Sequence, residues 1–308
     1  MDSMQASAAY SRVRTVAAAG SFVVLGAFAV VQRAQGRRLT AVEAARDRAD
    51  RALRAELRRA IAHGELVLHY QPAVDLESHA VTGFEALVRW EHPTRGLLSP
   101  SQFVPVAERT DVILSLGTWV LEEACRAAVA LQTEQHQPTM SVNIAARQLA
   151  SDSFVGQVTG ALAASGLAAD RLVLEITETA VLDDMAGVVR RLSALRALGV
   201  CIAIDDFGTG YNSMAYLSQL PVDMLKVDKS FVDHVCSDEH GAMVAHGIIA
   251  MSQTMNLRTV AEGVELPEQA SWLRTVRCSQ AQGFLWSRAV GLEAARDLLR
   301  PGALPVPA

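Results

Sequence analysis

The chain has 308 residues, of which half are apolar and only 5% aromatic, and it carries a net charge of −5. Residues 1–62 alone carry +6, with 11 Arg and no Lys, so the larger remaining part carries −11. This length suits one barrel-sized domain with an appendage, and the acidic charge argues against a groove for DNA or RNA, so we expect no binding to nucleic-acid polymers.

Residues 15–31 form an uncharged apolar stretch within the N-terminal segment 1–38. The stretch is slightly shorter than the roughly 20 residues that span a bilayer core. More basic residues follow it than precede it, which favours a single anchor in the inner membrane with the following chain in the cytoplasm. A cleaved signal peptide and a soluble segment are the alternatives. The four widely spaced cysteines are typical of reduced thiols, as expected for a cytoplasmic domain.

Residues 39–63 are rich in Ala and Arg and contain no Gly or Pro, which predicts a helical linker. Two interpretations stay open. The helix either lies on the main domain through an apolar face, or forms a parallel dimer stalk that carries a signal from the membrane.

Strands and helices alternate from residue 64 to residue 300, before a short tail at 301–308. The expected strands are 65–71, 81–89, 139–145, 172–177, 201–205, 223–227, 258–262 and 279–285. The expected helices are 101–133, 147–164, 180–198, 212–219, 239–256, 266–276 and 292–300. This alternation predicts an α/β fold, a modified (β/α)8 TIM-like barrel. Because only a short polar loop separates the first two strands, we expect the first strand to be antiparallel.

One of these strands, 201–205, runs directly into Asp205 and Asp206 and then into a loop with Gly208 and Gly210. Two adjacent carboxylates repel each other unless a cation or a proton lies between them. Neighbouring side chains on a strand point to opposite faces, so a pair that serves one site needs a bend, which the glycines permit. The alternative is a turn Asp followed by a helix N-cap.

Other strands also carry side chains of metal-ligand or catalytic type near their carboxyl ends. These residues are Glu85, Asn143, Glu175, Lys226, Glu262 and Gln282. In a barrel of this class, that rim is where active sites lie. Carboxylates converging there would repel strongly without cations, and all-oxygen ligands favour Mg²⁺ or Mn²⁺ over zinc. The adjacent pair Asp205 and Asp206 indicates two ions that share one bridging carboxylate.

The motifs around these residues follow one another in a distinctive order. They are Tyr70-Gln71-Pro72, Glu85-Ala86-Leu87, Val142-Asn143-Ile144, Leu174 to Glu178, Asp205 to Tyr211, Leu225 to Asp228, Ala261 to Glu265 and Gln282-Gly283-Phe284. Over roughly residues 55–300 the chain resembles the EAL domains, which are bacterial phosphodiesterases specific for cyclic-di-GMP. The resemblance implies hydrolysis of cyclic-di-GMP to linear pGpG with two ions, Mg²⁺ or Mn²⁺.

The resemblance also implies roles for individual residues. One ion would be bound by Glu85, Asn143, Glu175 and Asp205, and the second by Asp205, Asp206 and Glu262. Lys226 would hydrogen-bond the bridging water, Gln282 would orient a water near the second ion and contact the substrate, and Glu262 is open to a second role as general base. Glu178 would anchor the loop Asp206–Asn212, and Gln71, Arg89 and Asp228 would contact the substrate.

Three positions depart from the common pattern of the family: Ala145 where Ser is common, Asn212 where Ser is common, and Ala289 where Pro is common. None of them removes an expected ligand. The resemblance further implies a homodimer, formed around Asp205 to Leu217. A catalytically silent cyclic-di-GMP receptor and an unrelated metal-dependent barrel enzyme acting on carboxylate substrates are the alternatives. The complete ligand set favours the phosphodiesterase.

Overall fold

The computed structural model describes residues 48–181, 184–208, 217–300 and 302–305. The chain divides into two units, residues 1–55 and 56–308. Residues 48–55 of the first unit are helical, and residues 56–63, at the start of the second, are helical as well. Within the described ranges no helix is long and apolar enough to cross a membrane. The apolar stretch 15–31 lies outside these ranges, so the expected anchor stays a prediction.

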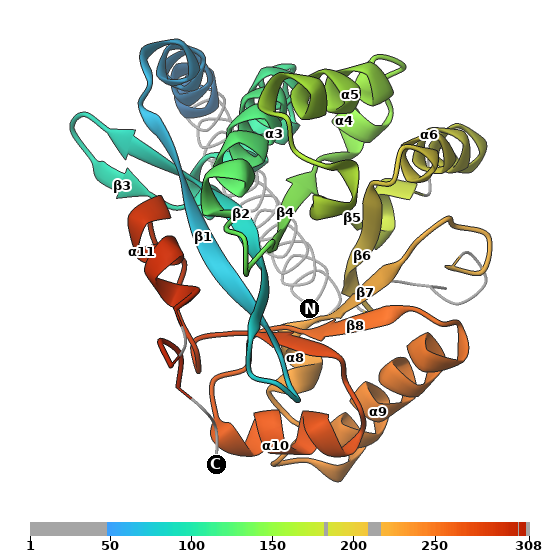
Figure 1. The fold of residues 1–308 in the computed structure, drawn as a ribbon. Coiled ribbons are helices and arrows are strands. Elements are labelled where there is room, and N and C mark those ends of the chain that lie inside the picture. Colours follow the sequence, from blue (N-terminus) through green and yellow to red (C-terminus); the bar gives the residue numbers. More distant parts are fainter. Residues whose placement is uncertain (1–47, 182–183, 209–216, 301, 306–308) are drawn as a thin grey trace, which may run out of the picture. The chain divides into compact units, whose positions relative to one another are not determined.

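The second unit contains one sheet whose ends meet. Its strands are β1 (Leu66–Asp75), β2 (Val81–His92), β3 (Gly96–Leu98), β4 (Thr139–Ile144), β5 (Leu172–Thr177), β6 (Cys201–Phe207), β7 (Met224–Val227), β8 (Arg258–Ala261) and β9 (Gln280–Gln282). They lie in the order β1-β9-β8-β7-β6-β5-β4-β2-β3, and β1 also pairs with β2, so eight strands close a barrel (Figure 1). The predicted modified (β/α)8 TIM-like barrel is confirmed.

The first strand runs against both of its neighbours, as predicted. β1 is antiparallel to β2 and to β9, whereas β2, β4, β5, β6, β7, β8 and β9 are parallel from one to the next. The connection from Asp75 to Val81 is too short for a crossover helix, so β2 returns directly alongside β1. The short strand β3, which the sequence did not predict, pairs only with the end of β2 and lies outside the barrel.

Helices cover the outside of the barrel (Figure 1). They are α2 (Val104–Glu108), α3 (Val112–Leu131), α4 (Ala146–Leu149), α5 (Phe154–Ser165), α6 (Met185–Ala197), α8 (Lys229–Val232), α9 (Glu239–Thr254), α10 (Pro267–Thr275) and α11 (Leu292–Leu298). Short 3₁₀ turns lie at Pro100–Gln102, Ala169–Arg171 and Glu178–Val181. The helix expected over 101–133 is broken before Val112, and the expected helix 212–219 lies mostly outside the described residues.

A layer of apolar side chains lies inside the barrel below its mouth. It consists of Val173, Cys201, Ala203, Met224 and Val260, all of them buried. Successive side chains of a strand alternate between the two faces, so the residue two positions further along points to the same side. Two positions after Val173, Ala203, Met224 and Val260 come Glu175, Asp205, Lys226 and Glu262. The alternation of β5 to β8 therefore places the candidate site directly on top of an apolar floor.

Candidate active site

A single buried lysine lies at the centre of the site. Lys226, in β7, is only 1% exposed. Its Nζ lies 2.6 Å from Glu262 Oε1, 2.7 Å from Glu175 Oε2, 3.3 Å from Asp205 Oδ1 and 3.6 Å from Glu85 Oε2. Glu85 lies in β2, Glu175 in β5 and Asp205 in β6. Glu262 is the first residue after β8. The structure therefore brings together side chains that are far apart in the sequence.

Asp206 joins this group because the backbone bends at Asp206 itself. Its φ is +52°, a left-handed conformation that few residues other than Gly adopt, although Asp is one of the better tolerated. The pairing of β6 with β7 shifts between Ile204 and Phe207, as in a β-bulge, so Asp205 and Asp206 together oppose one residue. The expectation that the glycines supply this bend is corrected: Gly208, with φ +99°, continues a turn that has already begun.

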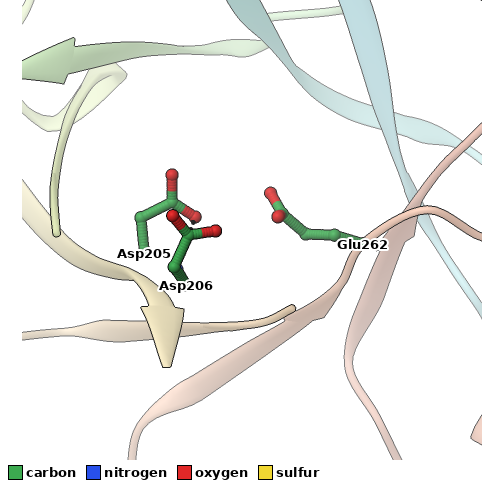
Figure 2. Close-up of side chains that lie close together, drawn as sticks. All are labelled: Asp205, Asp206 and Glu262. Carbon is green, nitrogen blue, oxygen red and sulfur yellow. Dashed lines mark hydrogen bonds between the residues drawn. The ribbon is translucent and has the colours of Figure 1, made fainter. Parts of the chain in front are cut away.

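The bend allows the adjacent carboxylates of Asp205 and Asp206 both to face Glu262. Oxygen atoms of Asp205, Asp206 and Glu262 all lie within 4.8 Å of one another, and Figure 2 shows the two Asp side chains together with Glu262 opposite them. Both Asp residues lie inside β6, not at the start of a helix, which contradicts the alternative of a turn Asp and an N-cap. Such a trio of oxygen ligands is suited to a divalent cation.

The charge of the cluster fits two such ions. Five carboxylates and one ammonium amount to a formal charge of −4 when all are ionised, which two divalent cations would balance. Burial raises the pKa of Glu262 to about 8, against the opposing effect of Lys226. Burial and the nearby Asp205 likewise raise the pKa of Asp206. Burial alone would lower the pKa of Lys226, but the surrounding carboxylates raise it well above its usual value, so Lys226 stays protonated.

Two amide side chains hold Glu85. Asn143 Nδ2 donates to Glu85 Oε1 at 2.7 Å, and Gln282 Nε2 donates to Glu85 Oε2 at 2.7 Å. Gln282 Nε2 also lies 3.2 Å from Gln71 Oε1, and Gln71 Nε2 donates to the backbone oxygen of Ser287 at 3.1 Å. Burial opposes ionisation of Glu85, but Lys226 and the two amides outweigh it and lower its pKa. Asn143 and Gln282 therefore contact the Glu85 carboxylate directly, and Gln71 contacts Gln282.

The remaining expected residues are Arg89, Asp228 and Glu178, and the charges of the first two reach Glu85 and Asp206. Arg89 Nη1 donates to the neighbouring backbone oxygen of Val88 at 2.9 Å. Asp228 caps α8 and accepts a hydrogen bond from the backbone nitrogen of Ser230 at 3.0 Å. Glu178 lies in the 3₁₀ turn after β5, and its Oε2 is buried without a hydrogen-bond partner among the described residues. Most of the loop that Glu178 is expected to anchor, Asp206–Asn212, falls outside these residues.

Comparison with known proteins decides the family. The family model described as EAL domain matches residues 54–289, which include every strand of the barrel and the whole cluster. The chain belongs to the EAL-domain family. This EAL domain is 45% identical over 246 residues to the cyclic di-GMP phosphodiesterase NbdA of Pseudomonas aeruginosa, a match that covers 80% of this chain and 31% of that protein.

A second relative and a solved structure agree with this assignment. The bifunctional diguanylate cyclase/cyclic di-GMP phosphodiesterase MucR of Pseudomonas aeruginosa is 42% identical over 239 residues, 77% of this chain and 35% of that protein. The structure of the PaMucR phosphodiesterase in complex with c-di-GMP has a TM-score of 0.75 and 41% identity, and the match covers 79% of this chain and 99% of that one. The chain thus spans about a third of the length of these two curated relatives.

Two of the three departures from the family pattern can be placed in the EAL domain. Ala145 is the N-cap of α4 and makes no side-chain cap, although its backbone nitrogen donates to Gln148 Oε1 at 3.2 Å. The other amide atom, Gln148 Nε2, is buried without a partner among the described residues. Ala289 precedes Val290, whose backbone pairs with Tyr70 of β1. Asn143 keeps its contact with Glu85, so Ala145 does not displace it.

Proposed function

We propose that this EAL domain is a cyclic-guanylate-specific phosphodiesterase that hydrolyses cyclic-di-GMP to linear pGpG with two divalent ions, Mg²⁺ or Mn²⁺. The observation that carries the proposal is the convergence of five carboxylates from β2, β5, β6 and the residue after β8 around the ammonium of Lys226. The names of two relatives, at 45% and 42% identity, support the substrate and the reaction.

In this proposal the ligands divide between two ions. Glu85, Asn143, Glu175 and Asp205 would bind one, and Asp205, Asp206 and Glu262 the other, with Asp205 shared. Asn143 donates through Nδ2 to Glu85, which leaves its carbonyl oxygen as the ligand atom. When bound, the ions would lower the pKa of a coordinated water so that it can attack the phosphorus at neutral pH, and would neutralise charge on the phosphoryl oxygens and on the 3′ oxygen that leaves.

The chain's own residues would orient that attack. Lys226 is protonated, so it acts as a hydrogen-bond donor to the water and not as a base. Glu262 faces Asp205 and Asp206, so it is placed either to bind the second ion or to accept a proton, and both roles are kept. The Arg89 guanidinium is the natural partner for a substrate phosphate. Gln71, Asp228 and Gln282 would contact the rest of the substrate, and Glu178 would support the loop beyond β6.

The alternative is a silent receptor that binds cyclic-di-GMP without cleaving it. Purified full-length chain is incubated with cyclic-di-GMP and Mn²⁺ or Mg²⁺, and the products are separated by ion-exchange chromatography. We expect pGpG, no product with EDTA, and no product from the variant Glu85→Ala. Binding of cyclic-di-GMP without formation of pGpG would establish the receptor instead. Absence of both would contradict the phosphodiesterase and the receptor alike.

Three further expectations stay predictions. They are the single membrane anchor at 15–31, the cytoplasmic position of the catalytic domain, and the homodimer formed around Asp205 to Leu217. The anchor falls outside the described residues, as does most of the dimer segment.

A further inference from the structure

Glu262 owes its position to a short loop that turns sharply. It is the first residue after β8, which ends at Ala261. The next residue, Gly263, has a φ of +67°, a conformation that other residues seldom adopt. Gly also has the most conformational freedom of any residue, so the turn does not hold its own shape. Something outside the loop has to keep Glu262 aimed at Asp205 and Asp206.

Hydrogen bonds from two strands fix the residues on either side of Gly263. The backbone nitrogen of Glu262 donates to Val227 O of β7 at 3.0 Å. The backbone nitrogen of Val264 donates to Gln282 O of β9, also at 3.0 Å. These bonds fix the two ends of the turn, and Gly263 lies between them.

Lys229, the first residue of α8, lies directly on Gly263. A Cβ atom placed on Gly263 would come within 2.3 Å of Lys229 Cγ and 2.6 Å of Lys229 Cβ and Cδ. The aliphatic stem of the lysine therefore covers the Cα atom of the glycine. Lys229 Nζ then donates to Glu265 Oε1 at 3.0 Å and to Asp233 Oδ1 at 2.7 Å, with a longer contact of 3.5 Å to Gly263 O.

A buried glutamine ties the far end of the loop to the same helix. Gln269 is 3% exposed, and its Oε1 accepts from the backbone nitrogens of Glu265 and Leu266 at 2.9 and 3.0 Å. Its Nε2 donates to Val232 O, the last residue of α8, at 3.2 Å. Lys229 at the beginning of α8 and Val232 at its end thus both hold the loop that follows Glu262.

We propose that Lys229 is a positioning residue for Glu262 that acts through Gly263. The inference rests on the proposed function only in taking Glu262 as a ligand of a divalent ion. The Lys229 side chain is 45% exposed, so its ion pairs alone would contribute little to stability. What the contact supplies is a fixed path for the turn, and with it a fixed backbone position from which the Glu262 carboxylate reaches Lys226.

The test separates the stem of Lys229 from its charge. Lys229→Met keeps most of the stem and removes the ammonium, whereas Lys229→Ala removes the ammonium and all of the stem beyond Cβ. Arg126→Met is the matched control, because Arg126 also forms an exposed helical ion pair, with Glu123 at 2.7 Å on the outer helix α3. Each full-length variant is titrated with Mn²⁺ by isothermal calorimetry. The Mn²⁺ dependence of turnover and the KM for cyclic-di-GMP are measured alongside.

We expect Lys229→Ala to bind the weaker of the two Mn²⁺ ions about tenfold less tightly, the lower end of what loss of a supporting contact costs a metal site. Lys229→Met should lose less Mn²⁺ affinity, and Arg126→Met should bind Mn²⁺ as tightly as the unchanged chain. Turnover of Lys229→Ala should recover at saturating Mn²⁺ with KM unchanged. A Mn²⁺ titration of Lys229→Ala that superimposes on that of Arg126→Met would overturn the proposal.

A readout without metal distinguishes this proposal from the proposed function. In EDTA, the backbone amide of Val264 should exchange its hydrogen faster in Lys229→Ala than in Arg126→Met, because the turn before it is less constrained. Equal exchange rates would overturn the positioning role, whether or not the chain hydrolyses cyclic-di-GMP. If exchange is faster in Lys229→Ala but the unchanged chain forms no pGpG, the positioning role of Lys229 is supported and only the proposed function is contradicted.

Discussion

Lys226 Nζ and Glu262 Oε1 lie 2.6 Å apart at the mouth of the barrel, and this pair joins β7 to the residue that follows β8. The ammonium is the one cation within 4 Å of Glu85, Glu175, Asp205 and Glu262 among the described residues. In the metal-free chain it therefore does part of what bound cations would do. Its removal should make the cluster depend on metal for stability.

We expect Lys226→Met to lower the free energy of unfolding in EDTA by about 3 kcal/mol, because it leaves buried carboxylates without a charged partner. Added Mn²⁺ should raise the melting temperature of this variant more than that of the unchanged chain. Lys229→Met, which removes an exposed ammonium three residues away, should cost less than about 1 kcal/mol. Urea unfolding with and without Mn²⁺ measures both. Equal losses for the two lysines would contradict the central position of Lys226.

The raised pKa of Glu262 has a consequence for the stability of the metal-free chain. Its ordinary value is 4.5 and its folded value is about 8, so between these values the folded chain holds a proton that the unfolded chain has released. The raised pKa of Glu262 therefore contributes fully to the free energy of unfolding below about pH 4.5, and this contribution is lost as the pH rises through 8. The melting temperature in EDTA should therefore fall between pH 6 and pH 8.5, and Glu262→Gln should reduce this fall. An unchanged slope in the variant would assign it to another group.

Asp206 combines a charge with a left-handed backbone, and two substitutions separate these properties. Asn tolerates this conformation about as well as Asp, whereas Ala should cost about 1 kcal/mol more. We expect Asp206→Asn to fold as stably as the unchanged chain but to lose turnover and one Mn²⁺ ion. Asp206→Ala should lose these and also unfold at lower urea concentration. Equal stability of the two variants would show that the positive φ carries no strain.

Ala145 offers a change in the stabilising direction. A Ser at this N-cap position should hydrogen-bond an unpaired backbone nitrogen at the start of α4 and stabilise the chain by about 0.5–1 kcal/mol. Ala145→Ser should therefore raise the urea midpoint without lowering turnover, since Asn143 already contacts Glu85. Ala145→Val serves as the control, because Val adds side-chain volume without an oxygen and is as poor an N-cap residue as Ala. A drop in turnover for Ala145→Ser would show that the active site of this chain requires the small, apolar side chain of Ala145.

Much of this protein follows from local patterns in its sequence. Alternating strands and helices indicated the barrel, and the short loop between β1 and β2 indicated the antiparallel first strand, because both depend only on residue spacing. The carboxylates at strand ends indicated a metal site, because the carboxyl ends of parallel strands meet at one rim. The short elements β3 and α8 were missed, since three or four residues show too little periodicity to predict.

Tertiary structure alone decided how the site is held together. Nothing in the side-chain pattern reveals the sign of φ, so the bend at Asp206 could not be distinguished from a bend at Gly208. The contacts of Lys226 with four carboxylates depend on how β2, β5, β6, β7 and β8 close around one axis. Lys229 and Gly263 are 34 positions apart in the sequence, and they can pack together because Gly263 has no Cβ atom where the Lys229 stem lies. The sequence determined which charged and polar side chains are available for the site. The tertiary structure determined which of them are in contact, because these contacts join segments that come together only on folding.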